Sequence, residues 1–264
     1  MMRITQLALA TSTMLGVSIV HAMAAPAIGL VGDKTLVMFD TEDGKVTKTM
    51  DVADVEKLLG IDFRPADKTV IGVTEDHRIV AINIESGTVN EVSKMNEMLP
   101  LTRGQAVIVD FNPMADRLRF MTGTTNHRVH PDTGAVTVDG KLAFEKGDVA
   151  EGSEGKIAAA AYTNSIGKPE KTAMFNIDAG NKTLVQQTKP NDGTLKTIGK
   201  LDISESPETY AFDIQGMAEG LNTAYLVGDN TIYTVDLDTG AATKVGTIEK
   251  LDGHLRDIAI LPAS

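Results

Sequence analysis

The chain has 264 residues, with 25 lysines and arginines against 36 aspartates and glutamates, so its formal net charge is −11. It contains no cysteine and no tryptophan. These counts exclude a disulfide scaffold, a zinc-thiolate site, a cysteine nucleophile and a basic nucleic-acid-binding domain. A hydrophobic content of 42% supplies a large core, so we expect a globular protein.

The N-terminus has the layout of a secretory signal peptide. A single cation, Arg3, precedes an apolar stretch from Leu7 to Val20, and the small-residue site Ala22-Met23-Ala24 follows. A transmembrane anchor is the alternative, but the stretch is shorter than the ~20 apolar residues that span a bilayer. We therefore expect a signal peptide over 1–24 and one domain over 25–264. Loss of Arg3 leaves 24 − 36 = −12 charges, and we expect the mature chain in the periplasm or outside the cell, with no membrane span.

One recurrent unit is an alternating strand, an acidic turn that contains glycine, and a second alternating strand. Its first copy covers Thr35–Thr47, and the turn glycines of the five copies are spaced 43, 47, 46 and 60 residues apart. Glycine adopts the positive φ that hairpin turns require. The glycines are Gly44, Gly87, Gly134, Gly180 and Gly240.

A short amphipathic segment follows the first hairpin. Asp51–Leu59 begins with a capping aspartate and has apolar residues at helical spacing, which predicts one or two turns of helix.

A second recurrent unit predicts an inner strand in each repeat. It pairs an aspartate, or an alanine in one copy, with an apolar or aromatic residue, and its first residues are spaced 48, 51, 52 and 44 apart. Each repeat then contains four strands; in the second repeat we place them at 60–64, 69–73, 78–84 and 88–92. The five positions are Asp62, Asp110, Ala161, Asp213 and Asp257.

Five repeats in 240 residues give 48 residues each, which is typical of four-stranded propeller blades. The first repeat, Ala27–Val52, lacks an inner strand, and Arg256–Leu261 arrives alone at the C-terminus. Joining the two completes a blade from both chain ends and removes free sheet edges. We predict an all-β, five-bladed β-propeller; a six-bladed ring with one degenerate blade, or a pair of β-sandwiches, is the alternative.

Several ordered strings resemble a known family of secreted bacterial proteins, the domain of unknown function 4394. They include Leu59–Pro65, Asp110–Arg119, Asn126–Gly134, Ala160–Ser165 and Asn191–Leu195. The resemblance covers essentially the whole mature chain and implies a secreted, propeller-like domain with no assigned activity. It implies no catalytic residues. His127, between Asn126 and Arg128, departs from the aliphatic residue expected there.

The four repeated aspartates are the main candidate site. Inner strands line a propeller channel, so the carboxylates of Asp62, Asp110, Asp213 and Asp257 would converge and could bind a hard cation such as Ca²⁺. The structural interpretation is that each carboxylate accepts backbone amides and holds its blade. Recurrence in nearly every blade favours the structural interpretation.

A second candidate is a polar mouth over the channel. Arginines next to the inner strands could grip a carboxylate or phosphate, or could form salt bridges between blades, which we favour. Around the aspartates, this mouth would comprise Arg64, Asn112, Asn126, Arg128, Tyr162, Asn164 and Arg256. His127 and His130 lie three residues apart in an extended segment, so they make a poor metal pair.

Catalytic signatures such as Gly-x-Ser-x-Gly, His-Glu-x-x-His and the phosphate-binding glycine loop do not occur in the sequence. We therefore predict a monomeric, non-enzymatic module that binds a small ligand or a protein, without a resident cofactor unless Ca²⁺ binds. The alternative is a divalent-cation-dependent hydrolase or lactonase that uses the channel carboxylates. A structural surface component is a third class, which no residue distinguishes.

Overall fold

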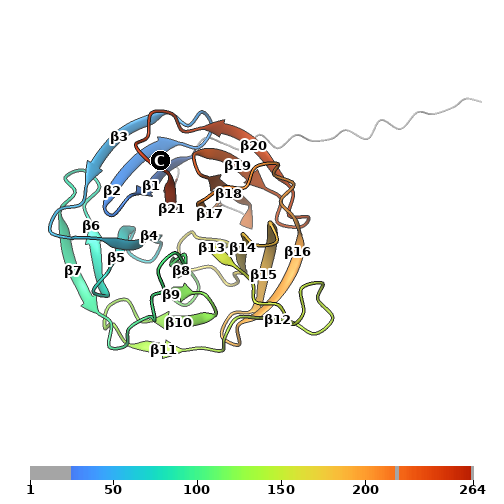
Figure 1. Cartoon of the computed structure of the whole chain (residues 1–264). Helices are drawn as coiled ribbons and strands as arrows, with labels where there is room; N and C mark the ends of the chain where they lie inside the picture. The colour runs from blue at the N-terminus through green and yellow to red at the C-terminus, as the bar shows by residue number, and fades with distance from the viewer. Residues whose placement is uncertain (1–24, 218–219, 263–264) are drawn as a thin grey trace, which may run out of the picture.

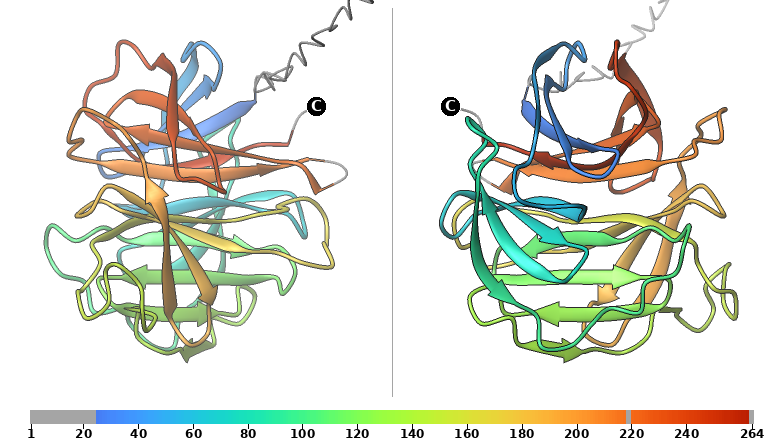
Figure 2. Two further views of the ribbon diagram at one scale, coloured as in Figure 1. Left: turned by 90° about the vertical axis from the view of Figure 1, so that its right-hand side faces the viewer. Right: turned by 60° about the vertical axis from the view of Figure 1, so that its left-hand side comes forward.

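The computed structural model describes residues 25–217 and 220–262, and the predicted signal peptide lies outside them. Five small sheets surround a central channel (Figure 1), so the predicted five-bladed β-propeller is confirmed and the six-bladed and sandwich alternatives are wrong. The innermost strands lie around the centre of the ring, and the outer strands run along its rim (Figure 1); Figure 2 gives two side views. No helix within the described residues is long and apolar enough to cross a membrane.

We number the blades in chain order. Blade 1 contains β21 (Leu255–Ile260), β1 (Pro26–Val31), β2 (Thr35–Asp40) and β3 (Val46–Asp51), and blade 2 contains β4 (Leu58–Arg64), β5 (Thr69–Thr74), β6 (Arg78–Ile82) and β7 (Val89–Lys94). Blade 3 contains β8 (Ile108–Asn112), β9 (Arg117–Thr122), β10 (Thr125–Val129) and β11 (Val136–Val138). Blade 4 contains β13 (Ile157–Tyr162), β14 (Met174–Asp178), β15 (Thr183–Lys189), β16 (Thr194–Lys200) and the short parallel strand β12 (Ala143–Phe144). Blade 5 contains β17 (Tyr210–Gly216), β18 (Asn222–Gly228), β19 (Thr231–Val235) and β20 (Ala242–Thr247).

The two chain ends close the ring in blade 1. The last strand, β21, is the innermost strand of this blade and pairs antiparallel with β1, from Ala27 opposite Ile260 to Leu30 opposite Asp257. The predicted closure is therefore confirmed.

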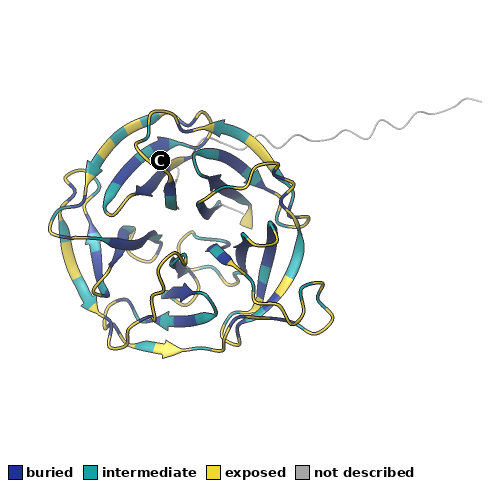
Figure 3. Cartoon of the chain, in the orientation of Figure 1, coloured by how far each residue is buried: buried dark blue, intermediate teal, exposed yellow. Residues whose placement is uncertain are grey.

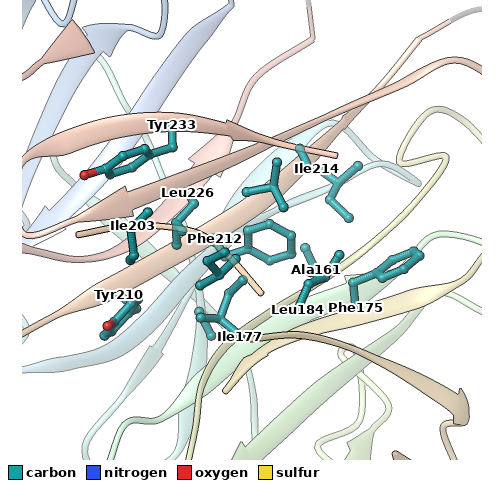
Figure 4. Close-up of a cluster of buried hydrophobic side chains, with 14 residues drawn as sticks. Ala161, Phe175, Ile177, Leu184, Ile203, Tyr210, Phe212, Ile214, Leu226 and Tyr233 are labelled. Atoms are coloured by element: carbon teal, nitrogen blue, oxygen red, sulfur yellow. The ribbon is translucent and has the colours of Figure 1, made fainter. Parts of the chain in front are cut away.

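Burial decreases from the channel outward. Inner strands such as β4 are almost wholly buried, whereas outer strands such as β7 are exposed or half-buried (Figure 3). The core is divided among the seams between blades, because each sheet packs its two faces against its two neighbours. The seam between blades 4 and 5 holds Phe212, Ile177 and Leu226 among other apolar side chains (Figure 4).

The predicted helix over 51–59 is wrong. The chain turns after β3 and enters β4 at Leu58, and its amides bond to other segments: Val52 N to Lys34 O, and Ala53 N to Gly87 O. Asp54 has a φ of 56°, which an α-helix does not allow. The apolar residues Val52, Val55 and Leu58 of this segment instead enter the seam between blades 1 and 2, so tertiary packing overrides the helical pattern.

One repeat was misaligned by the glycine pattern. Gly44, Gly87, Gly134 and Gly240 lie between the two outermost strands of their blades. Gly180 lies one hairpin earlier, between β14 and β15, and the equivalent residue of blade 4 is Gly193, with a φ of 73°. The insertion that contains β12 shifts the spacing and hides this glycine.

Candidate functional site

The four repeated aspartates link neighbouring inner strands through a carboxylate ring, the name used below for Asp62, Asp110, Asp213 and Asp257. Each carboxylate accepts a backbone amide from the inner strand of the next blade, which is the structural role that recurrence favours. The donors are Phe111 N to Asp62 Oδ2 at 2.6 Å, Tyr162 N to Asp110 Oδ1 at 3.0 Å, Ile260 N to Asp213 Oδ2 at 2.6 Å, and Ile61 N to Asp257 Oδ2 at 2.8 Å. Four of the five seams are therefore held by a carboxylate.

The remaining seam, between blades 4 and 5, has Ala161 at the aspartate position. Ala161 is fully buried and packs in the apolar cluster with Phe212 and Ile177 (Figure 4). Hydrophobic contact takes the place of the hydrogen bond to an aspartate at this seam.

Burial and mutual repulsion make the carboxylate ring reluctant to ionise. Burial raises the pKa of Asp213 to about 6 and that of Asp257 to about 8. The pKa of Asp62 and of Asp110 is also raised well above the usual range, first by burial and then by the charge of neighbouring ring members. The ring therefore holds protons at pH values where exposed aspartates are ionised.

Asp62, Asp110 and Asp213 are the residues best placed to meet a cation. Each offers one oxygen, and these oxygens lie within 4.8 Å of one another. Carboxylate oxygens suit Ca²⁺, but that ion takes about six to eight ligands. The three carboxylates already accept amide hydrogens, so they supply only part of such a coordination shell.

Arg64 lies at the end of the channel where the inner strands finish. Its buried guanidinium bonds Asp116 at 2.6 and 2.8 Å, Asp132 at 2.7 Å and Asp67 at 3.0 Å. These acids come from turns of blades 2 and 3, so Arg64 joins two blades. Its donors are used within the protein, as the salt-bridge interpretation expects.

A second polar group fills the seam between blades 3 and 4. Arg119, which is 2% exposed, donates to Tyr162 Oη at 3.3 Å, Asn126 Oδ1 at 2.8 Å and Asp139 Oδ2 at 2.8 Å. Arg128 also pairs with Asp139, at 3.1 Å. Asn126, Arg128 and Tyr162 therefore lie together in a seam between blades.

The other predicted mouth residues lie at opposite ends of the channel. Asn112 accepts amides of its own turn, and Asn164 pairs with Asn222 of blade 5, both where inner strands end. Arg256 lies where the inner strands begin and donates to the carbonyls of Leu58 and Leu59. The structure thus gathers the four aspartates and distributes the arginines and asparagines over three places.

A cavity of about 1620 Å³ opens at the end of the channel where the inner strands begin. Every blade contributes, through residues such as Leu59, Val107, Ala158, Tyr210 and Arg256. The charged lining residues are Asp33, Lys57, Glu75, Arg103, Glu154, Lys156, Lys182, Glu208 and Arg256. The result is a wide pocket whose lining includes charged side chains of both signs.

Of the predicted mouth residues, only Arg256 lines this cavity. The cavity is built by connections between blades, which differ in length and sequence, so a search for repeats does not find it. The sequence feature that could have indicated the cavity is the long polar connection from β7 to β8, which carries Thr102, Arg103 and Gln105.

A family model, the domain of unknown function DUF4394, matches residues 35–259. The chain belongs to the DUF4394 family. This confirms the family resemblance, and the propeller described above is its fold in this chain. No curated protein matches the sequence.

Several solved structures are similar to this DUF4394 protein at low identity. A protein of unknown function from Bacteroides thetaiotaomicron is 15% identical with a TM-score of 0.52, over 88% of this chain and 63% of that one. A putative 6-phosphogluconolactonase from Bacteroides uniformis is 14% identical with a TM-score of 0.45, over 84% and 82% of the two chains. Virginiamycin B lyase from Staphylococcus aureus is 13% identical with a TM-score of 0.41, over 84% and 70%. The likeness to the Bacteroides thetaiotaomicron protein concerns the fold alone.

Proposed function

We propose that this DUF4394 protein is an exported, non-enzymatic binding module whose ligand occupies the cavity at the start of the inner strands. The observation that carries the proposal is the cavity itself, about 1620 Å³ and lined by all five blades. Pockets for single small molecules measure about 300–1,000 Å³. The ligand is therefore an oligomer, such as a peptide or an oligosaccharide, or a projecting segment of a protein.

The lining supports a polar ligand. Nine charged side chains of both signs border the cavity, and Tyr210 is its aromatic residue. Stacking on aromatic rings is thus a minor contribution, and hydrogen bonds and ion pairs would select the ligand. Arg103 and Lys156 are exposed on this lining and offer charged donors.

A binding role fits the carboxylates better than catalysis does. The ring carboxylates accept amide hydrogens across the seams, and cavity lining residues include neither histidine nor cysteine within the described chain. The signal-like segment over 1–24 supports export. N-terminal sequencing of the secreted protein is expected to begin at Ala25.

Ligand class is tested by thermal stabilisation with two probes, a tryptic digest of casein and a pectin hydrolysate. A ligand that binds only the folded state raises the melting temperature by mass action. We expect one probe to stabilise the protein and the double variant Arg103→Glu/Lys156→Glu to lose that stabilisation. Lys45→Glu, in an exposed turn of blade 1, is the matched control and should retain it. Stabilisation that survives the double substitution would contradict binding in this cavity.

The competing function is a metal-dependent hydrolase or lactonase built on Asp62, Asp110 and Asp213, whose oxygens lie within 4.8 Å. A melting scan with Ca²⁺, Zn²⁺ and EDTA separates the two. A metal that binds the ring would raise the midpoint in the wild type, and Asp110→Asn would abolish the shift. A midpoint that no metal moves is the result expected for the binding module.

A further inference from the structure

The segment between β7 and β8, residues 95–107, forms part of the rim of the cavity through 100–107. Its first half is fixed to blades 2 and 3. Met95 N donates to His77 O at 3.0 Å, Asn96 N donates to Gly134 O at 3.0 Å, and Leu99 N donates to His77 Nε2 at 2.9 Å. Leu99 is 2% exposed, so its amide cannot turn to water instead.

Beyond Leu99 the rim is held weakly. Among the described residues between Leu99 and Ala106, the one backbone–backbone hydrogen bond runs from Gln105 N to Thr102 O, and both residues belong to the segment itself. The next attachment is Thr122 Oγ1, which donates to Ala106 O at 2.8 Å. The side chain of His77 is therefore the last hydrogen-bonding partner before the exposed part of the rim.

The neutral imidazole of His77 satisfies both of its neighbours. Its Nε2 accepts from Leu99, so the proton lies on Nδ1, which donates to Glu75 O at 3.1 Å. The ring is fully buried, and the edge-to-face ring of Phe120 lies 5.3 Å from it. A second proton on Nε2 would point at the Leu99 amide, so two donors would face each other.

We propose that His77 is a pH-sensitive pin for the cavity rim: the neutral ring holds Leu99, and protonation releases residues 100–105. This deepens the proposed function, since it gives the same cavity a mouth that loosens in mildly acidic surroundings. Burial lowers the pKa of His77, which keeps the ring neutral near neutral pH.

Other charged groups around the ring do not replace the lost bond. Asp76 belongs to the same turn, but it already pairs with Arg78 at 3.0 Å and Lys94 at 3.6 Å. His127, from β10, faces the same seam and disfavours a second charge, and burial lowers its own pKa. Glu97, in the rim segment, and Asp139 act on His127. A charged His77 therefore has no carboxylate acceptor at Nε2.

Hydrogen exchange of residues 95–107, measured at about pH 7.5 and about pH 5 with labelling times scaled to intrinsic rates, tests the pin. Protection of Leu99 in the wild type is expected to fall about tenfold on acidification, as for a buried amide that loses its acceptor. His77→Gln places a non-titrating acceptor near Nε2 and should keep protection at both pH values. His77→Asn is too short and should lack it at both. His127→Gln is the matched control and should respond to acid like the wild type.

Equal loss of protection in His77→Gln and in the wild type would overturn the proposal, as would a wild type whose Leu99 stays protected. Because φ at His77 is 62°, a variant could fail to fold. An NMR titration of the wild type then decides: the Leu99 amide and the His77 ring must titrate with one midpoint, and an unmoved amide refutes the pin. Neither measurement uses a ligand, so failure of the proposed binding function would leave this result intact.

Discussion

At the scale of single residues, the aspartates of the carboxylate ring balance two opposed effects. Asp62 accepts Phe63 N at 2.7 Å on one oxygen and Phe111 N at 2.6 Å on the other, and Asp213 does the same with Ile214 and Ile260. These bonds favour the ionised carboxylate, whereas burial and the neighbouring acids disfavour it. The raised pKa values show that burial outweighs the amides.

Loss of one oxygen acceptor should be measurable. Asp62→Asn keeps one acceptor and leaves one buried amide unpaired, so we expect it to lower the free energy of unfolding by about 1–3 kcal/mol. Asp62→Ala leaves two amides unpaired and should cost roughly twice as much. Urea unfolding measures both. Asp238→Asn, at an exposed turn, is the control and should stay within about 0.5 kcal/mol of the wild type. An Asp62→Ala variant with the same free energy of unfolding as the wild type would contradict the proposed role of Asp62 in linking two blades.

Stability should also depend on pH. An acid whose pKa is raised in the folded state holds its proton more tightly there, so raising the pH favours unfolding up to that pKa. With the pKa of Asp213 at about 6 and that of Asp257 at about 8, we expect the free energy of unfolding to fall as the pH rises from the ordinary aspartate value of 3.8 up to these two values. The two histidines have the opposite effect. Because the pKa values of His77 and His127 are lowered in the folded state, the unfolded chain takes up protons first, and stability is lost as the pH falls below the usual histidine range. Urea titrations at several pH values check this.

Comparison of the wild type with Asp257→Asn isolates the contribution of the Asp257 carboxyl group to this pH dependence. This variant should lose less stability than the wild type between those pH values, because it has no proton to release. The two histidines add no pH dependence above their usual range, so a wild type whose stability rises between about pH 7 and about pH 8 would contradict the raised pKa of Asp257.

At the scale of the element, the outer turns determine how closely the blades approach. The turn glycine of one blade lies against the backbone at the end of the outer strand of the preceding blade. Gly134 faces Lys94 O, and Gly87 faces Asp51 O. Both have positive φ values, 69° and 76°. A side chain there would suffer strain and also push two blades apart.

Two glycines separate these effects. Gly104, with φ of 83° and open space around it, should tolerate alanine at a cost of about 1–2 kcal/mol from backbone strain alone. Gly134→Ala meets the Lys94 carbonyl as well, so we expect a larger loss, by several kcal/mol. Denaturant unfolding of the two variants gives the difference. Equal losses of stability in the two variants would show that the blades move apart at this seam at little cost.

At the scale of the whole molecule, β21 holds the ring closed. It pairs with β1, its Asp257 accepts an amide hydrogen from blade 2, and the amide of its Ile260 donates to Asp213 of blade 5. Deletion of 255–264 should abolish the cooperative thermal transition, whereas deletion of 262–264 spares the strand and should preserve it. Circular dichroism on heating distinguishes the two. A cooperative melt of the chain that lacks 255–264 would show that the ring closes without β21.

Repetition explains what the sequence could predict. The aspartates recur at blade spacing because four of the five inner strands form the same bond to a neighbour, so the fold, its closure and Asp62, Asp110, Asp213 and Asp257 could be found from the sequence. The helix prediction for 51–59 failed because the apolar residues at helical spacing pack between two blades instead. Gly193 was missed because an insertion changed the spacing of the repeat. The cavity and the bond from Leu99 to His77 arise from connections unique to each blade, which no period reveals.

The closure of blade 1 also sets the mechanical behaviour of the protein. Ala27, near the start of β1, pairs with Ile260, at the end of β21. A force that pulls these two ends apart acts across the strands and loads one hydrogen-bonded pair at a time, so the seal would peel open from this end. Tension on the chain termini is therefore resisted far less than the same tension applied along the strands.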